Sequence, residues 1–474
     1  MLNSIPRIII TALKGGSGKT IFSLGLTSAW KKKGYSVSTF KKGPDFIDAG
    51  WLTFAAGRPC YNLDPFLMND SQIIRSLLSN SAESDISLIE GNRGLFDGLD
   101  VGGSYSTAEL GKLTGSPVII IADVTMTTRT IAALIMGCQR FDPGLNITAV
   151  ILNRVAGSRQ DNLVRNSVEQ YCGIPVIGSV PKLKEKIFPE RHMGLVPHLE
   201  TEHAQNAIKW ARNVVEENID LDVIWRLAHR AGPLPLSSDN SQEVHNISRL
   251  KSAARIGFIR DSSFWFYYPE NLDHLKEMGA TLVEINSMAD RGLPDLDALY
   301  IGGGFPETKA EILTKNRGFR DSLNQMIDKG LPVYAECGGL IYLGEALHIN
   351  DDIFPMVGAL PLSFIMEKRP QGHGYTILKT ERDSPYYHVG EILKGHEFHY
   401  SRPVIRNGEN IEPIFRVQRG QGLDGERDGL VKKNLLATYT HLHAGGNSLW
   451  SRRFFQAALD YKELVKKNTK MITK

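Results

Sequence analysis

Short apolar runs alternate with amphipathic stretches along the first half of the chain. The runs predict buried strands, and the amphipathic stretch Ile21 to Lys33 predicts a helix. The predicted strands are Ile8 to Leu13, Ser36 to Phe40, Ile86 to Glu90, Val118 to Ala122 and Ala149 to Leu152. This alternation favours an α/β fold in which helices cover both faces of a parallel sheet.

A second alternating block begins at Arg255. Its predicted strands are Ile256 to Ile259, Thr281 to Ile285, Ala298 to Ile301 and Pro332 to Ala335, and its clearest helix is Asn271 to Met278. The segment from Ala231 to Ser241 has the Pro, Gly and Ser content of a linker. We therefore predict two doubly wound domains, residues 1–232 and 254–465, joined by a linker at 233–253 and followed by a frayed lysine-rich tail at 466–474.

Composition excludes several classes of protein. The chain has 474 residues, of which 42% are hydrophobic and 23% charged, as in ordinary globular proteins. Lys and Arg total 55 against 52 for Asp and Glu, so the net charge of +3 does not indicate a nucleic-acid or membrane partner. The 4 cysteines are far apart, and no apolar run reaches the roughly 20 residues that span a bilayer. We expect a cytoplasmic protein.

The first predicted strand runs directly into the glycine-rich loop Lys14-Gly-Gly-Ser-Gly-Lys-Thr at the head of a helix. Glycines let backbone N–H groups turn toward phosphates, Lys19 neutralises the β and γ charges, and the Thr20 hydroxyl can bind Mg²⁺. An ordinary P-loop has Gly where this chain has Leu13, so the match is to the variant with a lysine in the loop. The predicted ATP-binding residues are Lys14, Gly15, Gly16, Ser17, Gly18, Lys19 and Thr20. The alternative is a glycine-rich turn with no ligand.

Acidic residues follow the next two strands. Asp45 and Asp48 come after one, and Glu90 and Asp97 come at and after the end of the other. Carboxylates at these strand ends would hold Mg²⁺, with Glu90 as its ligand beside Thr20, or would position an acceptor carboxylate for attack on the γ-phosphate. The structural alternative is that Asp48 and Asp97 cap helices or turns. Asn153, at the end of a later strand, is a candidate to contact the adenine edge.

A cysteine in a glycine-rich turn marks the second half. Tyr334-Ala-Glu-Cys-Gly-Gly-Leu places Cys337 between a strand and a helix, where the helix dipole would lower the pKa of its thiol. Backbone N–H groups of Gly303, Gly304 and Gly338 would form an oxyanion hole for the adduct of a glutamine side-chain amide. These features indicate a nucleophile that hydrolyses glutamine. A buried cysteine more often only packs.

The base would come from Thr438-Tyr-Thr-His-Leu-His, whose His441 follows an apolar run. In many amidotransferases with a catalytic triad, a Glu two residues after this histidine orients its ring. Here that place is taken by His443. Either Cys337 and His441 suffice as a dyad, or another group orients the ring.

Two further clusters have both functional and structural interpretations. His396, Glu397 and His399 resemble a metal site, but on a strand the two histidines would face opposite sides. The aromatic run from Phe264 to Tyr268 is suited either to stacking on a flat macrocycle or to core packing.

Together these segments resemble the cobyrinic acid a,c-diamide synthase family, and the resemblance covers nearly the whole chain. The shared elements are Gly43-Pro-Asp-Phe-Ile-Asp, Gly57-Arg-Pro with Asn62-Leu-Asp, Arg191-His-Met-Gly-Leu-Val-Pro, Phe266-Tyr-Tyr-Pro-Glu-Asn-Leu, Gly302-Gly-Gly-Phe-Pro-Glu, Ala335-Glu-Cys-Gly-Gly and Tyr439-Thr-His-Leu-His. The resemblance implies a dethiobiotin-synthetase-like ATPase domain and a class I glutamine-amidotransferase-like (flavodoxin-like) domain. It also implies that ammonia released at Cys337 and an acyl phosphate made with ATP and Mg²⁺ yield amides on the a and c acetates of a tetrapyrrole.

Three departures from the family pattern lie near the acceptor site or the phosphates. Asp48-Ala-Gly-Trp-Leu replaces Asp-Pro-x-x-His, Asn92-Arg93 replaces Val-Met, and Lys14 is unusual in the loop. Because Arg93 could pair with an extra substrate carboxylate, amidation of sirohaem or sirohydrochlorin is an alternative to amidation of cobyrinic acid. A switch resembling the partitioning ATPases, with a non-catalytic second domain, is a third. The oligomeric state is open, and a homodimer is one state to test.

Overall fold

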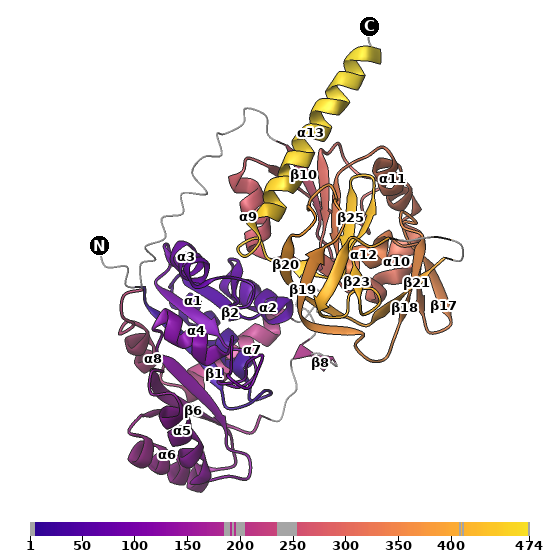
Figure 1. The fold of residues 1–474 in the computed structure, drawn as a ribbon. Coiled ribbons are helices and arrows are strands. Elements are labelled where there is room, and N and C mark those ends of the chain that lie inside the picture. The colour runs from indigo at the N-terminus through magenta and orange to yellow at the C-terminus, as the bar shows by residue number, and fades with distance from the viewer. Residues whose placement is uncertain are drawn as a thin grey trace. The chain divides into compact units, whose positions relative to one another are not determined.

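The computed structural model describes residues 5–183, 190–191, 194–195, 204–234, 254–406, 409 and 412–472. The chain divides into two compact units, residues 1–240 and 241–474 (Figure 1). This division falls inside the predicted linker, 233–253, most of which lies outside the described residues. The exact extent of the linker therefore stays a prediction.

The N-terminal unit is an α/β domain built on a parallel seven-stranded sheet with the order β3-β2-β4-β1-β5-β6-β7. Its strands are β1 (Arg7–Ala12), β2 (Val37–Lys42), β3 (Cys60–Leu63), β4 (Ile86–Glu90), β5 (Val118–Asp123), β6 (Ile147–Val155), β7 (Val176–Pro181), β8 (Glu190–Arg191) and β9 (Gly194–Leu195). Its helices are α1 (Lys19–Lys32), α2 (Phe46–Ala56), α3 (Asp70–Ser81), α4 (Thr107–Thr114), α5 (Thr130–Phe141), α6 (Ser158–Cys172), α7 (Ala204–Asn218) and α8 (Leu221–Ala228).

Alternate residues of the central strands face opposite helical layers, as two-sided burial of a sheet requires. Ile151 of β6 packs in the cluster of α1, α7 and α8, whereas its neighbour Leu152 packs in the cluster of α5 and α6. The five strands and the helix predicted for this unit are confirmed. The short strand β3 was missed because its sequence, Cys-Tyr-Asn-Leu, is not a continuous apolar run.

The C-terminal unit contains a second, largely parallel sheet with the order β12-β10-β13-β15-β25-β24, in which only β24 runs antiparallel to its neighbour. Its strands are β10 (Arg255–Ile259), β11 (Phe264–Phe266), β12 (Thr281–Ile285), β13 (Ala298–Ile301), β14 (Gly303–Gly304), β15 (Val333–Glu336), β16 (Ala346–Ile349), β17 (Asp352–Pro355), β18 (Leu362–Met366), β19 (Gly372–Thr380), β20 (Ile392–His399), β21 (Ser401–Ile405), β22 (Phe415–Arg419), β23 (Arg427–Asp428), β24 (Leu430–Lys432), β25 (Leu435–Thr438) and β26 (His441–Leu442). Its helices are α9 (Pro269–Glu277), the 3₁₀ helix η3 (Pro306–Lys309), α10 (Ala310–Lys315), α11 (Arg317–Asp328), α12 (Gly338–Leu343) and α13 (Ser448–Ile472).

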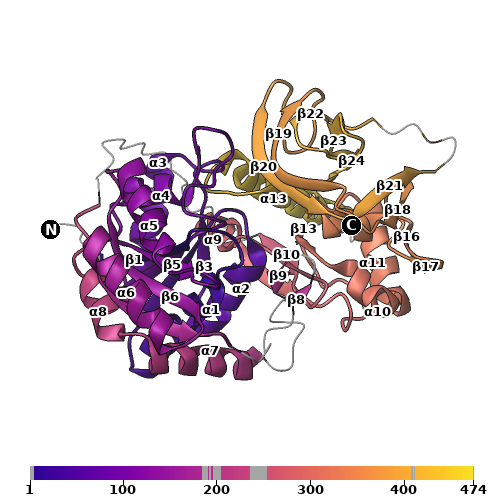
Figure 2. The ribbon, with the colours of Figure 1, turned by 90° about the horizontal axis from the view of Figure 1, so that it is seen from below.

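Helices α9 and α13 pack on one face of this sheet and α10, α11 and α12 on the other. Two further sheets, β17-β16-β18-β21 and β23-β22-β19-β20-β26, were not predicted, and Figure 2 shows the long strands β19 and β20 lying side by side. Helix α13 continues to Ile472, and its last turns extend away from the sheets of its own unit (Figure 1); the fraying expected for residues 466–474 stays a prediction. No helix in the described part of the chain is long and apolar enough to span a membrane.

Candidate functional site

The glycine-rich loop lies between β1 and α1, as predicted. Gly16 (φ 71°) and Gly18 (φ 96°) have left-handed backbones, which glycine adopts without strain. Lys14, Gly15 and Gly16 are exposed, whereas Ser17 and Lys19 are buried. The Nζ atom of Lys19 donates to the main-chain oxygen of Arg93 at 2.6 Å. The loop thus has the backbone freedom and the positioned lysine that a phosphate site needs.

Asn153 supports this loop from β6. Its Nδ2 atom donates to the Ser17 oxygen at 2.8 Å, and its Oδ1 atom accepts from the Arg154 N–H at 2.9 Å. A Cβ at Gly18 would lie 2.9 Å from the same Nδ2 atom. Both polar atoms of the amide therefore bind the protein itself. In the structure the Asn153 amide holds the loop, and its contact with adenine stays a prediction.

Three of the four predicted carboxylates gather around Lys41, a residue that sequence analysis did not single out. The Lys41 Nζ atom lies 2.6 Å from Asp48 Oδ2, 2.8 Å from Glu90 Oε1 and 4.0 Å from Asp45 Oδ2. Lys41 and Glu90 are register partners on β2 and β4, and each is at most 1% exposed. Burying an ammonium group requires such partners. The sequence does contain a signal for Lys41, because this lysine directly follows a predicted strand and shortly precedes two carboxylates.

Charges in this cluster shift one another's pKa values. Burial alone would lower the pKa of Lys41, but Asp48 and Glu90 hold it well above its usual value. Burial and the neighbouring Asp48 raise the pKa of Asp45 to about 7, and Asp45 also caps α2 by accepting from the Asp48 N–H at 2.9 Å. Burial likewise raises the pKa of Glu90. The salt bridge with Lys41 outweighs burial at Asp48 and lowers its pKa.

Asp97 and Lys14 lie at the edge of this site. Asp97 is exposed and accepts from the Gly94 N–H at 2.8 Å, which is the turn-capping alternative considered above. Its charge still acts on Lys19. The Lys14 side chain is 68% exposed and lies 3.5 Å from Asp123. Neither residue is part of the buried cluster around Lys41.

The oxygen atoms around Thr20 and Glu90 suit a magnesium ion. The Thr20 hydroxyl donates to Glu90 Oε1 at 2.9 Å. The second carboxylate oxygen of Glu90, Oε2, is buried with no hydrogen-bond partner among the described residues. A hydroxyl and a carboxylate are the hard ligands that Mg²⁺ prefers, so the two residues fit the predicted ion.

Cys337 lies in a sharp turn between β15 and α12. Its backbone has φ 47° and ψ −99°, an unfavourable conformation for a residue with a side chain, and its N–H donates to the Thr438 oxygen at 2.8 Å. Gly338 and Gly339 permit the turn, because a Cβ on Gly339 would lie 2.6 Å from the Ile301 oxygen. Backbone strain of this kind at a single residue is often found at catalytic sites.

Gly303 and Gly304 bring a second loop against the cysteine turn and the histidine. A Cβ on Gly338 would lie 3.0 Å from the Gly304 nitrogen, and one on Gly303 would lie 2.3 Å from Cε1 and 3.2 Å from Nε2 of His441. The loop is held by Tyr267, whose hydroxyl accepts from the Gly302 N–H at 2.8 Å. The glycines, Cys337 and His441 predicted from distant segments thus lie together.

The sequence predicted a lowered pKa for the Cys337 thiol, but the structure indicates a raised one. Burial, with the nearby carboxylates of Glu307 and Glu336, raises the pKa of this thiol, and the Gly338 N–H offsets only part of the effect. The following helix, α12, has only six residues, so its dipole is weak. The prediction of a lowered pKa was wrong because it ignored burial. A thiolate at Cys337 would therefore require a base to take the proton.

His441 lies beside the histidines that were considered as a possible metal site. The ring of His441 stacks on His396, with centroids 4.9 Å apart, and its Nδ1 atom lies 3.4 Å from Glu336 Oε2. His399 instead stacks on Tyr439 at 3.6 Å. The described residues contain no cluster of three or more His, Cys, Asp or Glu side chains arranged to hold a metal.

The aromatic run is a packing feature. Residues 264–268 are all buried, and Phe266 packs edge-on against Phe305 and His441. These rings are therefore unavailable for stacking on a macrocycle. The run therefore packs in the core beside Phe305 and His441, as in the core-packing alternative.

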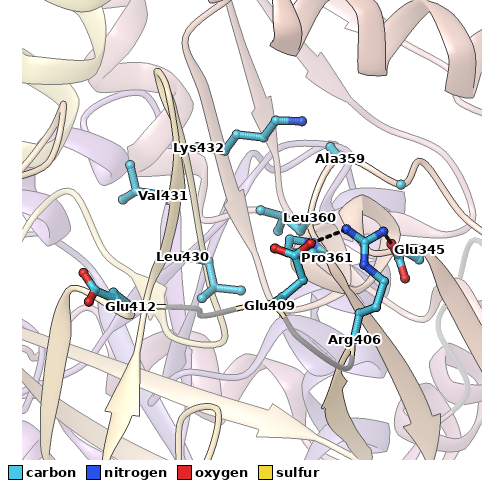
Figure 3. A pocket seen from close by; sticks show the side chains of 11 residues that line it. Glu345, Ala359, Leu360, Pro361, Arg406, Glu409, Glu412, Leu430, Val431 and Lys432 are labelled. Carbon is cyan, nitrogen blue, oxygen red and sulfur yellow. Dashed lines mark hydrogen bonds and ion pairs between the residues drawn. The ribbon is translucent and has the colours of Figure 1, made fainter.

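A separate pocket of about 390 Å³ lies in the C-terminal unit (Figure 3). Figure 3 shows Arg406 between Glu345 and Glu409, and each of these carboxylates lies 2.6 Å from the guanidinium. Glu412 and Lys432, also in the lining, pair with Arg382 and Asp328. These charges pair with one another or with neighbours, and none of the predicted site residues lines the pocket.

Comparison with known families identifies the two units. Residues 8–196 match the CobQ/CobB/MinD/ParA nucleotide binding domain, and residues 255–449 match the CobB/CobQ-like glutamine amidotransferase domain. The class is therefore an enzyme that joins a nucleotide-binding domain to a glutamine amidotransferase domain in one chain.

Full-length relatives narrow the class. The chain is 42% identical to the cobyrinate a,c-diamide synthase of Archaeoglobus fulgidus over 459 residues, covering 97% of this chain and 98% of that one. It is 39% identical to the enzyme of that name from Magnetococcus marinus (94% and 96% covered) and 37% identical to the one from Listeria monocytogenes (95% and 99% covered). The protein belongs to the cobyrinate a,c-diamide synthase family, a family of amidoligases that use glutamine.

Proposed function

We propose that this protein converts the a and c acetate carboxylates of cobyrinic acid into amides, using ATP and glutamine. The observation that carries the proposal is the presence in one chain of two groups of residues: the P-loop with its Lys41 carboxylate cluster, and the strained Cys337 turn with the Gly303 loop that contacts His441. Full-length relatives that carry the name cobyrinate a,c-diamide synthase support the choice of substrate.

The N-terminal reaction follows from the charges around the P-loop. An acetate oxygen attacks the γ-phosphorus of ATP, and the bond from that phosphorus to the oxygen bridging to the β-phosphate breaks. ADP departs, and the acetate has become an acyl phosphate. Lys19, buried at the head of α1, is placed to neutralise phosphate charge. Mg²⁺ bound by Thr20 and Glu90 would supply further neutralisation of the phosphate oxygens. Ammonia then attacks the acyl carbon, and phosphate leaves as the amide forms.

The C-terminal reaction supplies the ammonia. The Cys337 sulfur attacks the side-chain amide carbon of glutamine as His441 takes the thiol proton, and the Gly303–Gly304 loop with Gly338 provides N–H groups beside the developing oxyanion. His441 then donates the proton to the leaving nitrogen, which departs as ammonia. Water hydrolyses the thioester and releases glutamate.

Arg93 supports sirohydrochlorin or sirohaem as an alternative acceptor. Its side chain is exposed, its backbone has φ 50°, and its main-chain oxygen binds Lys19. An exposed guanidinium on a residue whose backbone contacts the P-loop lysine is suited to pairing with an additional carboxylate of a substrate. The same assay therefore offers both kinds of tetrapyrrole.

The test is amide formation by the purified full-length protein with ATP, Mg²⁺ and glutamine, offered cobyrinic acid and sirohydrochlorin in parallel and analysed by product mass. We expect a diamide of cobyrinic acid, with formation faster than for sirohydrochlorin. A Cys337→Ala variant should lose glutamine-dependent synthesis and keep synthesis from ammonium salts. Preference for sirohydrochlorin would reassign the substrate, and turnover of neither would refute the proposal.

A further inference from the structure

The buried carboxylate of Glu336 faces the proposed catalytic histidine. Its Oε2 atom lies 3.4 Å from His441 Nδ1, and both side chains are 1% exposed. Glu336 is the last residue of β15 and directly precedes Cys337. One strand end therefore carries both the nucleophile and a carboxylate directed at its base.

Hydrogen bonds fix this carboxylate in place. The Leu442 N–H donates to Glu336 Oε1 at 3.1 Å, and the Tyr300 hydroxyl donates to Oε2 at 3.0 Å. Tyr300 is itself held by Asn271, whose Nδ2 atom donates to the tyrosine oxygen at 3.2 Å. Donors to both oxygens restrict the movement of the carboxylate. The group is thus rigid as well as close.

The residue that takes the place of the usual orienting Glu is engaged elsewhere. His443 Nδ1 accepts from the Gly445 N–H at 3.1 Å, and its Nε2 atom lies 3.5 Å from Glu270 Oε2. Neither ring nitrogen of His443 is therefore directed at His441. His396 contacts His441 through its stacked ring face, and its own Nδ1 atom binds the Tyr268 hydroxyl at 3.0 Å.

The Cε1–Nε2 edge of the His441 ring faces the Gly303–Gly304 loop. Its Cε1 and Nε2 atoms lie against Gly303, in the loop that also contacts the cysteine turn at Gly338. A carboxylate at Nδ1 keeps the proton on that nitrogen and leaves Nε2 unprotonated as the base. Orientation and tautomer are then set by the same contact, as a third member of a catalytic triad would set them.

We propose that Glu336 is the positioning residue of the glutaminase site, holding His441 with its proton on Nδ1 so that Nε2 takes the proton of Cys337. In this role Glu336 acts only through His441 and exchanges no proton. Its carboxylate also stabilises the imidazolium that exists between removal of the thiol proton and its transfer to the departing ammonia. This inference rests on the proposed roles of Cys337 and His441.

The test compares Glu336→Gln with Glu270→Gln in the full-length protein. The two carboxylates form matched buried pairs, Glu336 with His441 at 3.4 Å and Glu270 with His443 at 3.5 Å. Since an amide can donate to Nδ1 and so favour the wrong tautomer, Glu336→Gln should lower kcat for glutamine hydrolysis about 10²- to 10⁴-fold. KM for glutamine and amide formation from ammonium salts should be unchanged. Glu336→Asp should recover part of kcat, and Glu270→Gln should stay within threefold of the parent.

The outcomes separate this inference from the proposed function. If Cys337→Ala or His441→Ala retains glutaminase activity, the proposed function of the site is wrong. If those variants are inactive but Glu336→Gln keeps kcat within threefold, or if Glu270→Gln falls as far as Glu336→Gln, the role of Glu336 is refuted. Should Glu336→Gln fail to fold, Tyr300→Phe removes one donor to the same carboxylate. It should lower kcat about three- to tenfold with KM unchanged, and an unchanged kcat would overturn the inference.

Discussion

Replacing Gly303 by alanine is a direct test of how His441 is placed. Gly303 lies in β14 outside the left-handed region, so alanine adds no backbone strain. Its new Cβ would lie 2.3 Å from His441 Cε1, whereas carbon atoms in contact are about 3.5 Å apart. The ring must therefore move by roughly 1 Å. It cannot move freely, because it is 1% exposed and stacked on His396.

The size of the effect follows from that displacement. A misplacement of about 1 Å at a catalytic group costs roughly 100-fold in rate, or about 2.7 kcal/mol of transition-state stabilisation. Overpacking a dense core costs about 1–3 kcal/mol of folding stability, so Gly303→Ala should fold with a lowered Tm. We expect kcat for glutamine hydrolysis to fall about 100-fold, with synthesis from ammonium salts retained.

The assay measures glutamate release and ammonium-dependent amide formation on the same preparation. Gly137→Ala is the matched control, because a Cβ at this position in α5 would meet no atom within 4 Å. It should leave both activities unchanged. Glutamine hydrolysis by Gly303→Ala within threefold of the parent would show that His441 is not the base or that its position does not limit the reaction.

Three further experiments test other parts of the structure. Lys41→Met leaves the carboxylates of Asp48 and Glu90 without their buried partner, which should cost about 3–5 kcal/mol and abolish ATP-dependent synthesis while glutaminase activity persists. An unchanged calorimetric Tm would contradict this. Because burial raises the pKa of the Cys337 thiol, its alkylation by iodoacetamide, followed by peptide mass, should still be increasing above pH 9. A plateau near pH 7 would restore the helix-dipole prediction. Arg453→Met removes two 2.6 Å bonds to Glu391 and should cost about 1–3 kcal/mol at pH 7. Arg453 lowers the pKa of Glu391, so this contribution is present above the usual Glu pKa of about 4.3 and is lost as pH falls through the lowered folded value. Urea unfolding that shows the same loss at pH 3 as at pH 7 would contradict it.

Sequence reasoning succeeded where the signal is local. Strand, glycine loop and helix are consecutive between Ile8 and Lys32, so the P-loop could be read directly from the chain. The turn at Cys337 could be predicted for the same reason. The protonation state of that thiol could not be predicted, because its pKa is governed by burial and by carboxylates from separate segments. The contact between the Asn153 amide and the P-loop could not be predicted, because it is set by tertiary packing.

The sequence by itself determined the two α/β domains, the glycine-rich loop and the cysteine turn, since each depends on residues that are neighbours along the chain. Only the tertiary structure decided which side chains meet across strands. Lys41 faces Glu90 because β2 and β4 pair in that register, and Glu336 reaches His441 because β15 lies beside β25, which leads into the histidine segment. A shift of one residue in either pairing would turn these side chains to the opposite face of the sheet. Strand register, which no short motif encodes, therefore fixed the charges around both sites.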